Sequence, residues 1–368
     1  MKSNQQHTHM PSGKESESPV SDSDLSCIRG CFPSLKKVVY LDAARKAPLS
    51  SEAAHAMSAY IEQALNCRDT KSLHMQQTKY ARDVLAAYLN VDTNKLRFAS
   101  STSDAVVLAL SSRGDSARGR IGVIEGSHPS VLAVVRQIAG LSEVVEIRVP
   151  EKAMESDHFE KQLAGVSVLC APRISSNGKQ YDVSYLASVL AGSGIALILD
   201  EAQSAGIYEL AETHCPTAHC FTLQKGFLCP PGIGAVCFSK AWDTEQGSIC
   251  EFGDRNQHVL SALPVSIRIL DSISRTKLHA HIRWLSQRFT ALVKPPNLLL
   301  HKGMHAPHIH LLDLPGRVWQ NYFFSQGIIV GEYGGILRVS FGCYTSENDL
   351  LLFADRLDRG IRDGLPTH

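Results

Sequence analysis

Two residues in the middle of the chain have the side chains that covalent amine chemistry needs. Asp200 directly follows the apolar run of residues 195–199, which predicts a buried parallel strand. The carboxyl ends of such strands face the crevice in which α/β sheets bind ligands. Lys225 precedes a stiff turn with Pro and Gly at residues 230–234. A lysine that can form a Schiff base and a carboxylate that can keep a ring nitrogen protonated together suggest pyridoxal phosphate as the cofactor.

Four segments carry a resemblance to a known family. Residues 197–206 (LILDEAQSAG) are similar to the cofactor segment of the class V pyridoxal-phosphate aminotransferases, the cysteine desulfurase-like branch of fold type I. Residues 39–48 (VYLDAARKAP), 97–105 (RFASSTSDA) and 337–345 (LRVSFGCYT) resemble further family segments in the same order. The resemblance covers about residues 38–360. It implies pyridoxal 5'-phosphate as cofactor, a large doubly wound domain with a mostly parallel sheet, and a smaller C-terminal α+β domain.

The resemblance implies cofactor-binding roles for particular residues. Lys225 would carry the covalent bond to the cofactor, Asp200 would hold the pyridine nitrogen, and Gln203 would hydrogen-bond the phenolic oxygen. The phosphate would lie at the start of a helix predicted over residues 104–110, where free backbone N–H groups and the helix dipole favour an anion. The residues expected to contact the phosphate are Ser101, Thr102, Ser103 and Thr222.

Three further positions match family sites. His128 falls where the family places a ring that stacks on the pyridine and can also move protons, so we assign it a catalytic and a cofactor-binding role. Ser175 lies near a cofactor-contacting Asn, Ser or Thr. Arg338 occupies the position that binds the substrate carboxylate, a task that suits the guanidinium fork.

The chain also departs from the family pattern at three places. Gln224 replaces the histidine that most members carry before the lysine, which removes a proton-relay group. Asp254 stands where a threonine of the neighbouring subunit donates to the phosphate, and an ionised carboxylate cannot donate. Arg255 or Asn256 would have to substitute for it. Residues 326–335, where desulfurases carry their nucleophilic cysteine, contain no cysteine.

We therefore expect a pyridoxal-phosphate-dependent enzyme, a lyase or transferase, that acts at the α-carbon of an amino-acid substrate. The missing cysteine disfavours persulfide transfer, and the resemblance to the desulfurase-like branch favours a C–S or β-lyase. Transamination and epimerisation remain alternatives, because the outcome depends on groups outside the cofactor. A weakly active paralogue that binds the cofactor and regulates is a further alternative, motivated by Gln224 and Asp254. The resemblance also implies a homodimer with shared active sites.

The elements that position these residues follow from alternating apolar runs and helical patterns, which predict a doubly wound α/β domain. Strands are predicted over residues 120–125, 166–171, 195–199 and 235–238, and helices over residues 50–65 and 182–192. A long helical pattern covers residues 260–292, and later strands are predicted at 310–314, 327–330 and 337–340 before a last helix at 347–361. The expected organisation is a disordered tail (1–30), a large cofactor-binding domain with an N-terminal arm (31–245) and a small C-terminal domain (246–368).

Composition and charge disfavour several function classes. The chain has 37 Lys and Arg against 36 Asp and Glu, and a net charge of +1 argues against nucleic-acid or membrane partners. No apolar stretch approaches the roughly 18 residues of a membrane span, and residues 1–26 lack the apolar core of a signal peptide. We expect a cytoplasmic protein with reduced cysteines. The Cys and His clusters at residues 27–31 and 214–220 lack the paired spacing of a zinc site, so no metal is predicted.

Overall fold

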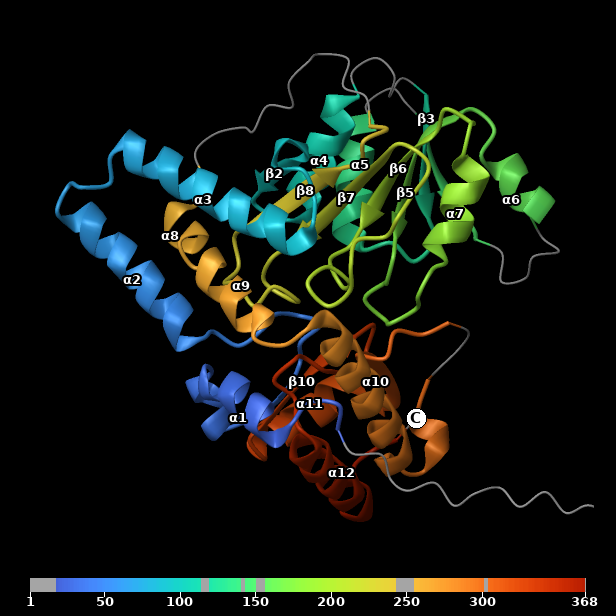
Figure 1. The fold of residues 1–368 in the computed structure, drawn as a ribbon. Helices are drawn as coiled ribbons and strands as arrows, with labels where there is room; N and C mark the ends of the chain where they lie inside the picture. Colours follow the sequence, from blue (N-terminus) through green and yellow to red (C-terminus); the bar gives the residue numbers. More distant parts are fainter. Residues whose placement is uncertain are drawn as a thin grey trace, which may run out of the picture.

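The computed structural model describes residues 18–113, 119–139, 143–149, 156–242, 255–300 and 304–367. Two β-sheets organise the fold, and helices pack on both (Figure 1). Within these ranges no helix combines the length and apolar character that crossing a bilayer requires.

The large sheet has seven strands in the order β2-β8-β7-β6-β5-β3-β4. Strand β8 runs antiparallel to its neighbours β2 and β7, and every other pair is parallel. The strands are β2 (Leu96–Ala99), β3 (Arg120–Ile124), β4 (Val144–Ile147), β5 (Val166–Pro172), β6 (Ala196–Asp200), β7 (Thr217–Thr222) and β8 (Gly234–Phe238). A mostly parallel sheet that is buried on both faces is the doubly wound arrangement, so the predicted fold class is confirmed.

Helices cover both faces of this sheet because its strands are apolar on both sides. Successive strand residues point to opposite faces. Accordingly Ile198 packs in the cluster formed with α4 (Thr102–Ser112) and α5 (Pro129–Ala139). Leu197 and Leu199 pack in the opposite cluster, formed with α6 (Ser156–Gln162) and α7 (Val183–Leu190). Asp200 at the end of β6 is thereby held by strand packing on both sides.

The second sheet has four strands in the order β1-β10-β11-β9. They are β1 (Val39–Leu41), β9 (Ile309–Pro315), β10 (Ile328–Tyr333) and β11 (Ile336–Ser340), and β1 pairs with β10 in parallel. Helices α10 (Arg275–Leu292), α11 (Gly316–Ser325) and α12 (Glu347–Arg362) accompany this sheet. The N-terminal segment thus contributes a strand to the sheet of the C-terminal region.

The remaining helices lie beside the two sheets. Helices α2 (Ser51–Leu65) and α3 (Lys71–Leu89) contact α8 (Gln257–Leu260) and α9 (Leu263–Asp271), as Figure 1 shows. Short 3₁₀ turns cover Pro33–Lys36, Thr93–Lys95 and Pro296–Leu298.

Two expectations need correction. The predicted tail extends too far, because α1 (Asp22–Gly30) is a helix that buries Leu25 and Ile28 and is capped by Ser21, whose side chain accepts from Asp24 N. The helical pattern of residues 260–292 is broken between α9 and α10. Ser274 accepts from Lys277 N and so starts α10 as a separate helix.

Candidate active site

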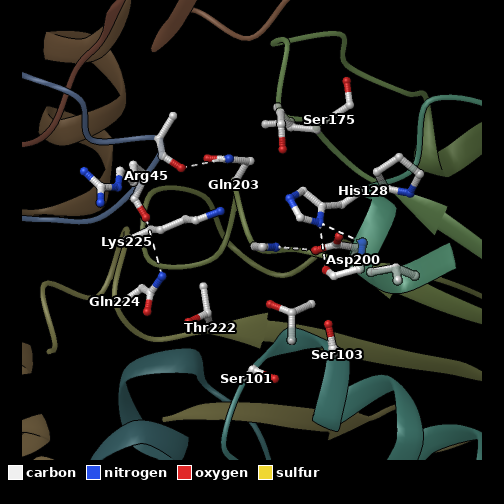
Figure 2. Close-up of a pocket in the computed structure, with 18 of the residues that line it drawn as sticks. Arg45, Ser101, Ser103, His128, Ser175, Asp200, Gln203, Thr222, Gln224 and Lys225 are labelled. Atoms are coloured by element: carbon white, nitrogen blue, oxygen red, sulfur yellow. Dashed lines mark hydrogen bonds between the residues drawn. The ribbon is translucent and has the colours of Figure 1, made fainter. Parts of the chain in front are cut away.

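A pocket of about 320 Å³ lies at the carboxyl ends of β5, β6 and β7, a volume within the range of small-molecule sites (Figure 2). Every residue that the sequence assigned to the site lines it: Ser101, Thr102, Ser103, His128, Ser175, Asp200, Gln203, Thr222, Lys225 and Arg338. Strands, loops and a helix start that are far apart in sequence therefore converge on one cavity.

Asp200 presents a desolvated carboxyl group to this pocket. Its Oδ1 accepts from the backbone N of Ala202 at 2.9 Å. Burial raises the pKa of Asp200, and the nearby charges of Lys225 and His128 oppose that rise. Within the described part of the chain no cation forms an ion pair with it. A carboxylate in this state needs a positive partner, and a protonated ring nitrogen is such a partner.

Lys225 is held beside the Asp200 loop by a backbone contact between two glycines. At Gly206 φ is +88°, and a Cβ there would lie 2.5 Å from the carbonyl carbon of Gly226. A side chain at Gly226 would in turn collide with the carbonyl oxygen of Ala205. Glycine is required at both positions, because the loops after β6 and β7 approach each other directly.

The surroundings of the Lys225 amine favour its neutral, nucleophilic form. Burial lowers its pKa from 10.5 to about 8, and the positive charge of Arg338 acts in the same direction, while Asp200 opposes both. A neutral amine can attack an aldehyde, whereas an ammonium group cannot. A substantial neutral fraction is therefore present near pH 8.

The start of α4 provides an anion site. Ser101 caps the helix, and its side chain accepts from Asp104 N at 3.1 Å. The backbone N–H groups of Thr102 and Ser103, in the first turn, have no acceptor within the helix. Thr222 at the end of β7 lines the pocket beside them. A helix N-terminus with adjacent hydroxyl groups suits a phosphate.

His128 and Ser175 border the pocket from other loops (Figure 2). Ser130 N donates to His128 Nδ1 at 3.2 Å, which leaves Nε2 to carry the proton of the neutral ring. Burial lowers the pKa of His128, and the charge of Lys225 adds to the effect. Ser175 is buried, and its hydroxyl donates to Lys179 O at 3.2 Å.

Gln203 is fixed on two sides. Its Nε2 donates to Ala44 O at 3.0 Å. His308 Nε2 donates to the Gln203 carbonyl oxygen at 2.8 Å, and burial lowers the pKa of His308 to about 4, so this ring is neutral. No sequence signal singled out His308, because it lies 105 positions from Gln203 and on a different loop.

Two residues of the site and its surroundings, Arg45 and Glu201, were not predicted from the sequence. Arg45 lines the pocket, as Gln224 does. It belongs to residues 39–48, a segment that resembles the family as a whole but in which no role was assigned to Arg45. Glu201, adjacent to Asp200, is completely buried and bonds His219 Nδ1 at 3.1 Å and Arg173 Nη1 at 3.3 Å. Burial alone would raise the pKa of Glu201, but these two partners lower it to about 2. An acidic residue directly after Asp200 was the only available signal.

Residues 254–256 were expected to reach the cofactor phosphate of a neighbouring subunit. Asp254 lies outside the described residues. Arg255 and Asn256 are described but are not among the residues that line the pocket. Their proposed part in phosphate binding therefore stays a prediction.

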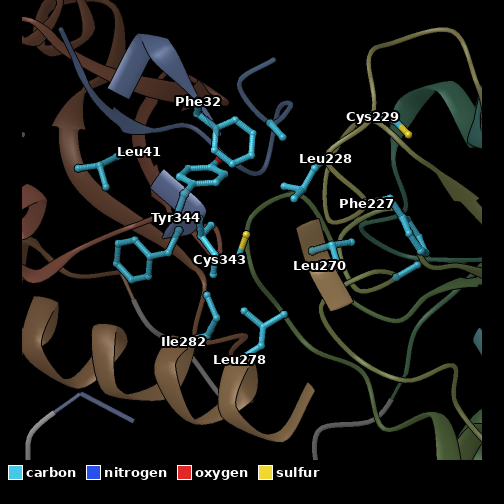
Figure 3. Packing of buried hydrophobic residues seen from close by; sticks show 14 of the residues in the cluster. Phe32, Leu41, Phe227, Leu228, Cys229, Leu270, Leu278, Ile282, Cys343 and Tyr344 are labelled. Atoms are coloured by element: carbon cyan, nitrogen blue, oxygen red, sulfur yellow. The ribbon is translucent and has the colours of Figure 1, made fainter. Parts of the chain in front are cut away.

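Cysteines are absent from the pocket lining in the described part of the chain. Cys343 instead packs in the apolar cluster with Tyr344, Leu228 and Leu278 (Figure 3). The described residues also contain no group of three His, Cys, Asp or Glu side chains placed to hold a metal.

These observations fit pyridoxal phosphate. The desolvated carboxyl of Asp200 matches the ring nitrogen, the Lys225 amine matches the aldehyde, and the start of α4 matches the phosphate. The three groups surround one cavity and differ in chemistry as the three ends of that cofactor do.

Two curated proteins are similar to this chain over almost its whole length. An uncharacterized protein of Schizosaccharomyces pombe is 21% identical over 396 residues, which cover 94% of this chain and 89% of the relative. An uncharacterized aminotransferase of the same organism is 18% identical, with coverage of 93% and 97%.

Solved structures show the same fold. A cysteine desulfurase from Thermococcus onnurineus NA1 matches with a TM-score of 0.76 at 18% identity, over 92% of this chain and 98% of that chain. A cystine C–S lyase bound to its product cysteine persulfide matches with a TM-score of 0.75 at 16% identity, over 89% and 98%. The family model of aminotransferase class V matches residues 39–287, more than half of the chain. The chain therefore belongs to the aminotransferase class-V family and is a pyridoxal-phosphate-dependent enzyme.

Proposed function

We propose that the enzyme is a C–S or β-lyase that acts at the α-carbon of an amino acid without a catalytic cysteine. The observation that carries the proposal is the lining of the pocket: Lys225 and Asp200 face it, and none of the described cysteines does. The likeness in fold to a cystine C–S lyase favours the same class of reaction.

The chain's own residues would hold the cofactor at three points. Bound pyridoxal phosphate supplies an aldehyde that bonds amines and a pyridinium ring that withdraws electrons from the substrate α-carbon. Asp200 would hold the proton on the ring nitrogen, and Gln203 would donate to the phenolic oxygen. The N–H groups of Thr102 and Ser103, with the Thr222 hydroxyl, would hold the phosphate.

Proton transfer at the substrate is assigned to Lys225. With a pKa of about 8, its Nζ can accept a proton from the α-carbon and return it at physiological pH. His128, with Nε2 carrying the proton, would pack against the ring and could donate from that atom. Arg338 would orient the substrate through its carboxylate.

The product distinguishes the reaction classes. A lyase converts L-cysteine and water to pyruvate, ammonia and hydrogen sulfide in equal amounts, without an added keto acid. A desulfurase yields alanine and protein-bound sulfur, and an aminotransferase yields a keto acid only when an acceptor is present. We expect pyruvate and sulfide from L-cysteine, or pyruvate and cysteine persulfide from L-cystine, and none of these products from the Lys225→Ala variant. Alanine as the main product would refute the lyase proposal.

The alternatives have their own signatures. Transamination is supported by the likeness to an uncharacterized aminotransferase, and it would appear as strict dependence on a keto-acid acceptor. Epimerisation would change the optical rotation of an amino acid without releasing ammonia, sulfide or a keto acid. A regulatory paralogue would bind the cofactor on Lys225 but turn over no member of an amino-acid panel.

We also propose a homodimer with shared active sites. Helices α2 and α3 expose large apolar side chains, each at least half accessible: Ile61, Leu65, Met75 and Tyr80. A dimer interface on these two helices would remove such side chains from water. Sedimentation velocity of the cofactor-loaded protein should show a dimer, and an active monomer at assay concentration would refute this.

A further inference from the structure

The cations that line the pocket differ in their partners. Arg338 has a carboxylate partner within the protein, because its Nη2 lies 3.3 Å from the buried Asp42 carboxylate. Lys225 is committed to the cofactor under the proposed function. Arg45 is exposed and, among the described residues, has no carboxylate within ion-pair distance. The mouth of the pocket therefore carries one guanidinium charge that neither the protein nor the cofactor uses.

The backbone on both sides of Arg45 is anchored to residues of the site. Gln203 Nε2 donates to Ala44 O at 3.0 Å, and Ala47 N donates to Gln224 O at 2.8 Å. Gln224 Nε2 reaches the carbonyl oxygen of Arg45 itself at 3.5 Å. The exposed side chain of Arg45 thus extends from a fixed base at the rim, on the same side of the pocket as Lys225 and Gln224 (Figure 2).

The neighbour of Arg45 leaves its charge available. Gln224 is an uncharged amide, so it cannot neutralise the guanidinium. The charge of Arg45 helps to keep the pKa of Asp42 and that of Tyr40 down, against the raising effect of burial on both groups. Asp42 is already bonded to Arg338, so the described residues offer Arg45 no other carboxylate partner, and an acidic group on the substrate would supply one.

We propose that Arg45 binds an anionic group on the side chain of the substrate, so that the enzyme prefers amino acids with a second, acidic group. This inference rests on the proposed function, since it places the α-carboxylate on Arg338 and the reacting amine beside Lys225. A side-chain carboxylate matches the guanidinium fork, and L-aspartate and L-glutamate carry that group without a C–S bond, so they serve as probes of binding.

The test compares acids with their amides, which are nearly equal in size and differ in charge. Binding of L-aspartate against L-asparagine, and of L-glutamate against L-glutamine, is measured on the cofactor-loaded protein by calorimetry and by the absorbance of the bound cofactor. We expect the wild-type protein to bind at least one acid more tightly than its amide. Arg45→Ala should lower that acid-to-amide affinity ratio by about fivefold or more, as loss of a hydrogen bond to a charged group predicts. Arg45→Lys should restore part of the ratio.

Lys46→Ala is the matched control. Lys46 is the next exposed cation along the chain, but it is not among the residues that line the pocket, so its removal tests for a general effect of surface charge. The ratio should not change in this variant.

Each other outcome overturns the inference. Equal weakening of acids and amides by Arg45→Ala would mean that Arg45 binds the α-carboxylate, and no change would make it an ordinary surface cation. If the wild-type protein turns over neutral amino acids and binds acids no better than amides, the Arg45 inference fails and the proposed function stands. If no cofactor attaches to Lys225, the proposed function fails and this inference fails with it.

Discussion

Asp42 and Arg338 form a buried ion pair that joins the two ends of the chain at the active site. Arg338 Nη2 lies 3.3 Å from Asp42 Oδ1, and the side chains are 9% and 2% exposed. Arg338 Nη1 also donates to Ser176 O at 3.3 Å. Gly331 packs directly on this pair, since a side chain there would collide with Asp42 Oδ1. The guanidinium is therefore oriented before any substrate arrives.

Removing Asp42 should lower the free energy of unfolding. Asp42→Ala leaves Arg338 buried without a counter-charge, and we expect a loss of roughly 3–5 kcal/mol in the free energy of unfolding, measured by urea denaturation. Asp83→Ala is the control, because Asp83 pairs with Lys79 on an exposed helix face, where the loss should be below about 1 kcal/mol. Equal losses in the two variants would contradict this account.

Lys225 should give cofactor attachment an unusual dependence on pH. Its pKa is lowered from 10.5 to about 8, so the neutral amine appears as the pH rises through 8. The rate of attachment to the apoprotein should rise about fivefold from pH 7 to 8 and less than twofold from pH 8 to 9. An ordinary lysine would give about tenfold over each interval, and that result would show that the pKa is not lowered.

Borohydride reduction should identify the attachment site independently. The reduced protein should carry the cofactor on the peptide that contains Lys225, and Lys225→Ala should carry none. Mapping of the adduct to any other lysine by mass spectrometry would show that the assignment is wrong.

Asp200 should matter for turnover more than for binding. Asp200→Asn keeps the hydrogen-bonding shape but cannot hold a pyridinium proton, so we expect retained cofactor and a loss of turnover of about a hundredfold or more. Asp182→Asn is a matched control, because Asp182 is the N-cap of α7 and asparagine caps as well as aspartate does. Unchanged turnover in Asp200→Asn would mean that the carboxylate has another role.

The resemblance to the family, more than local pattern, brought the site residues together before the structure did. Local signals placed a few of them: Asp200 ends an apolar run, and Ser101, Thr102 and Ser103 open a helix. The roles of these residues, and the boundaries of the domains, stay predictions. The contact of Gly206 with Gly226 explains why two loops with glycines at those positions meet.

Other features depend on contacts that no local pattern reveals. Glu201 directly follows β6, and His219 lies 18 positions later on the neighbouring strand β7. Only the register of these two strands makes them a buried pair. His219 lies in the Cys and His cluster of residues 214–220, whose polar composition does not predict a buried strand. Every residue of β7 is nevertheless buried. Similarly, β1 joins β10 from the opposite end of the chain, which segment-by-segment reasoning does not show.

Cys343 is the cysteine nearest in sequence to Arg338, and it is not placed to act as a nucleophile. The residue is 5% exposed and packs among apolar side chains, and burial raises the pKa of its thiol to about 12 (Figure 3). It shares with Lys225 the wall of a separate cavity of about 20 Å³, which has room for a water molecule but not for a substrate. A nucleophilic cysteine must be a thiolate on an accessible segment, and Cys343 meets neither condition.

Cys343→Ala should therefore keep turnover within about twofold of the wild type, with at most a modest loss of stability from the smaller side chain. Cys229→Ala is the control for packing, because Cys229 is equally buried, its pKa is also raised to about 12, and it does not line the substrate pocket. Turnover and cofactor absorbance are measured on the same preparations. If Cys343→Ala abolishes turnover with the cofactor still bound, while Cys229→Ala does not, the thiol takes part in the reaction. A persulfide mechanism would then replace the lyase mechanism proposed above.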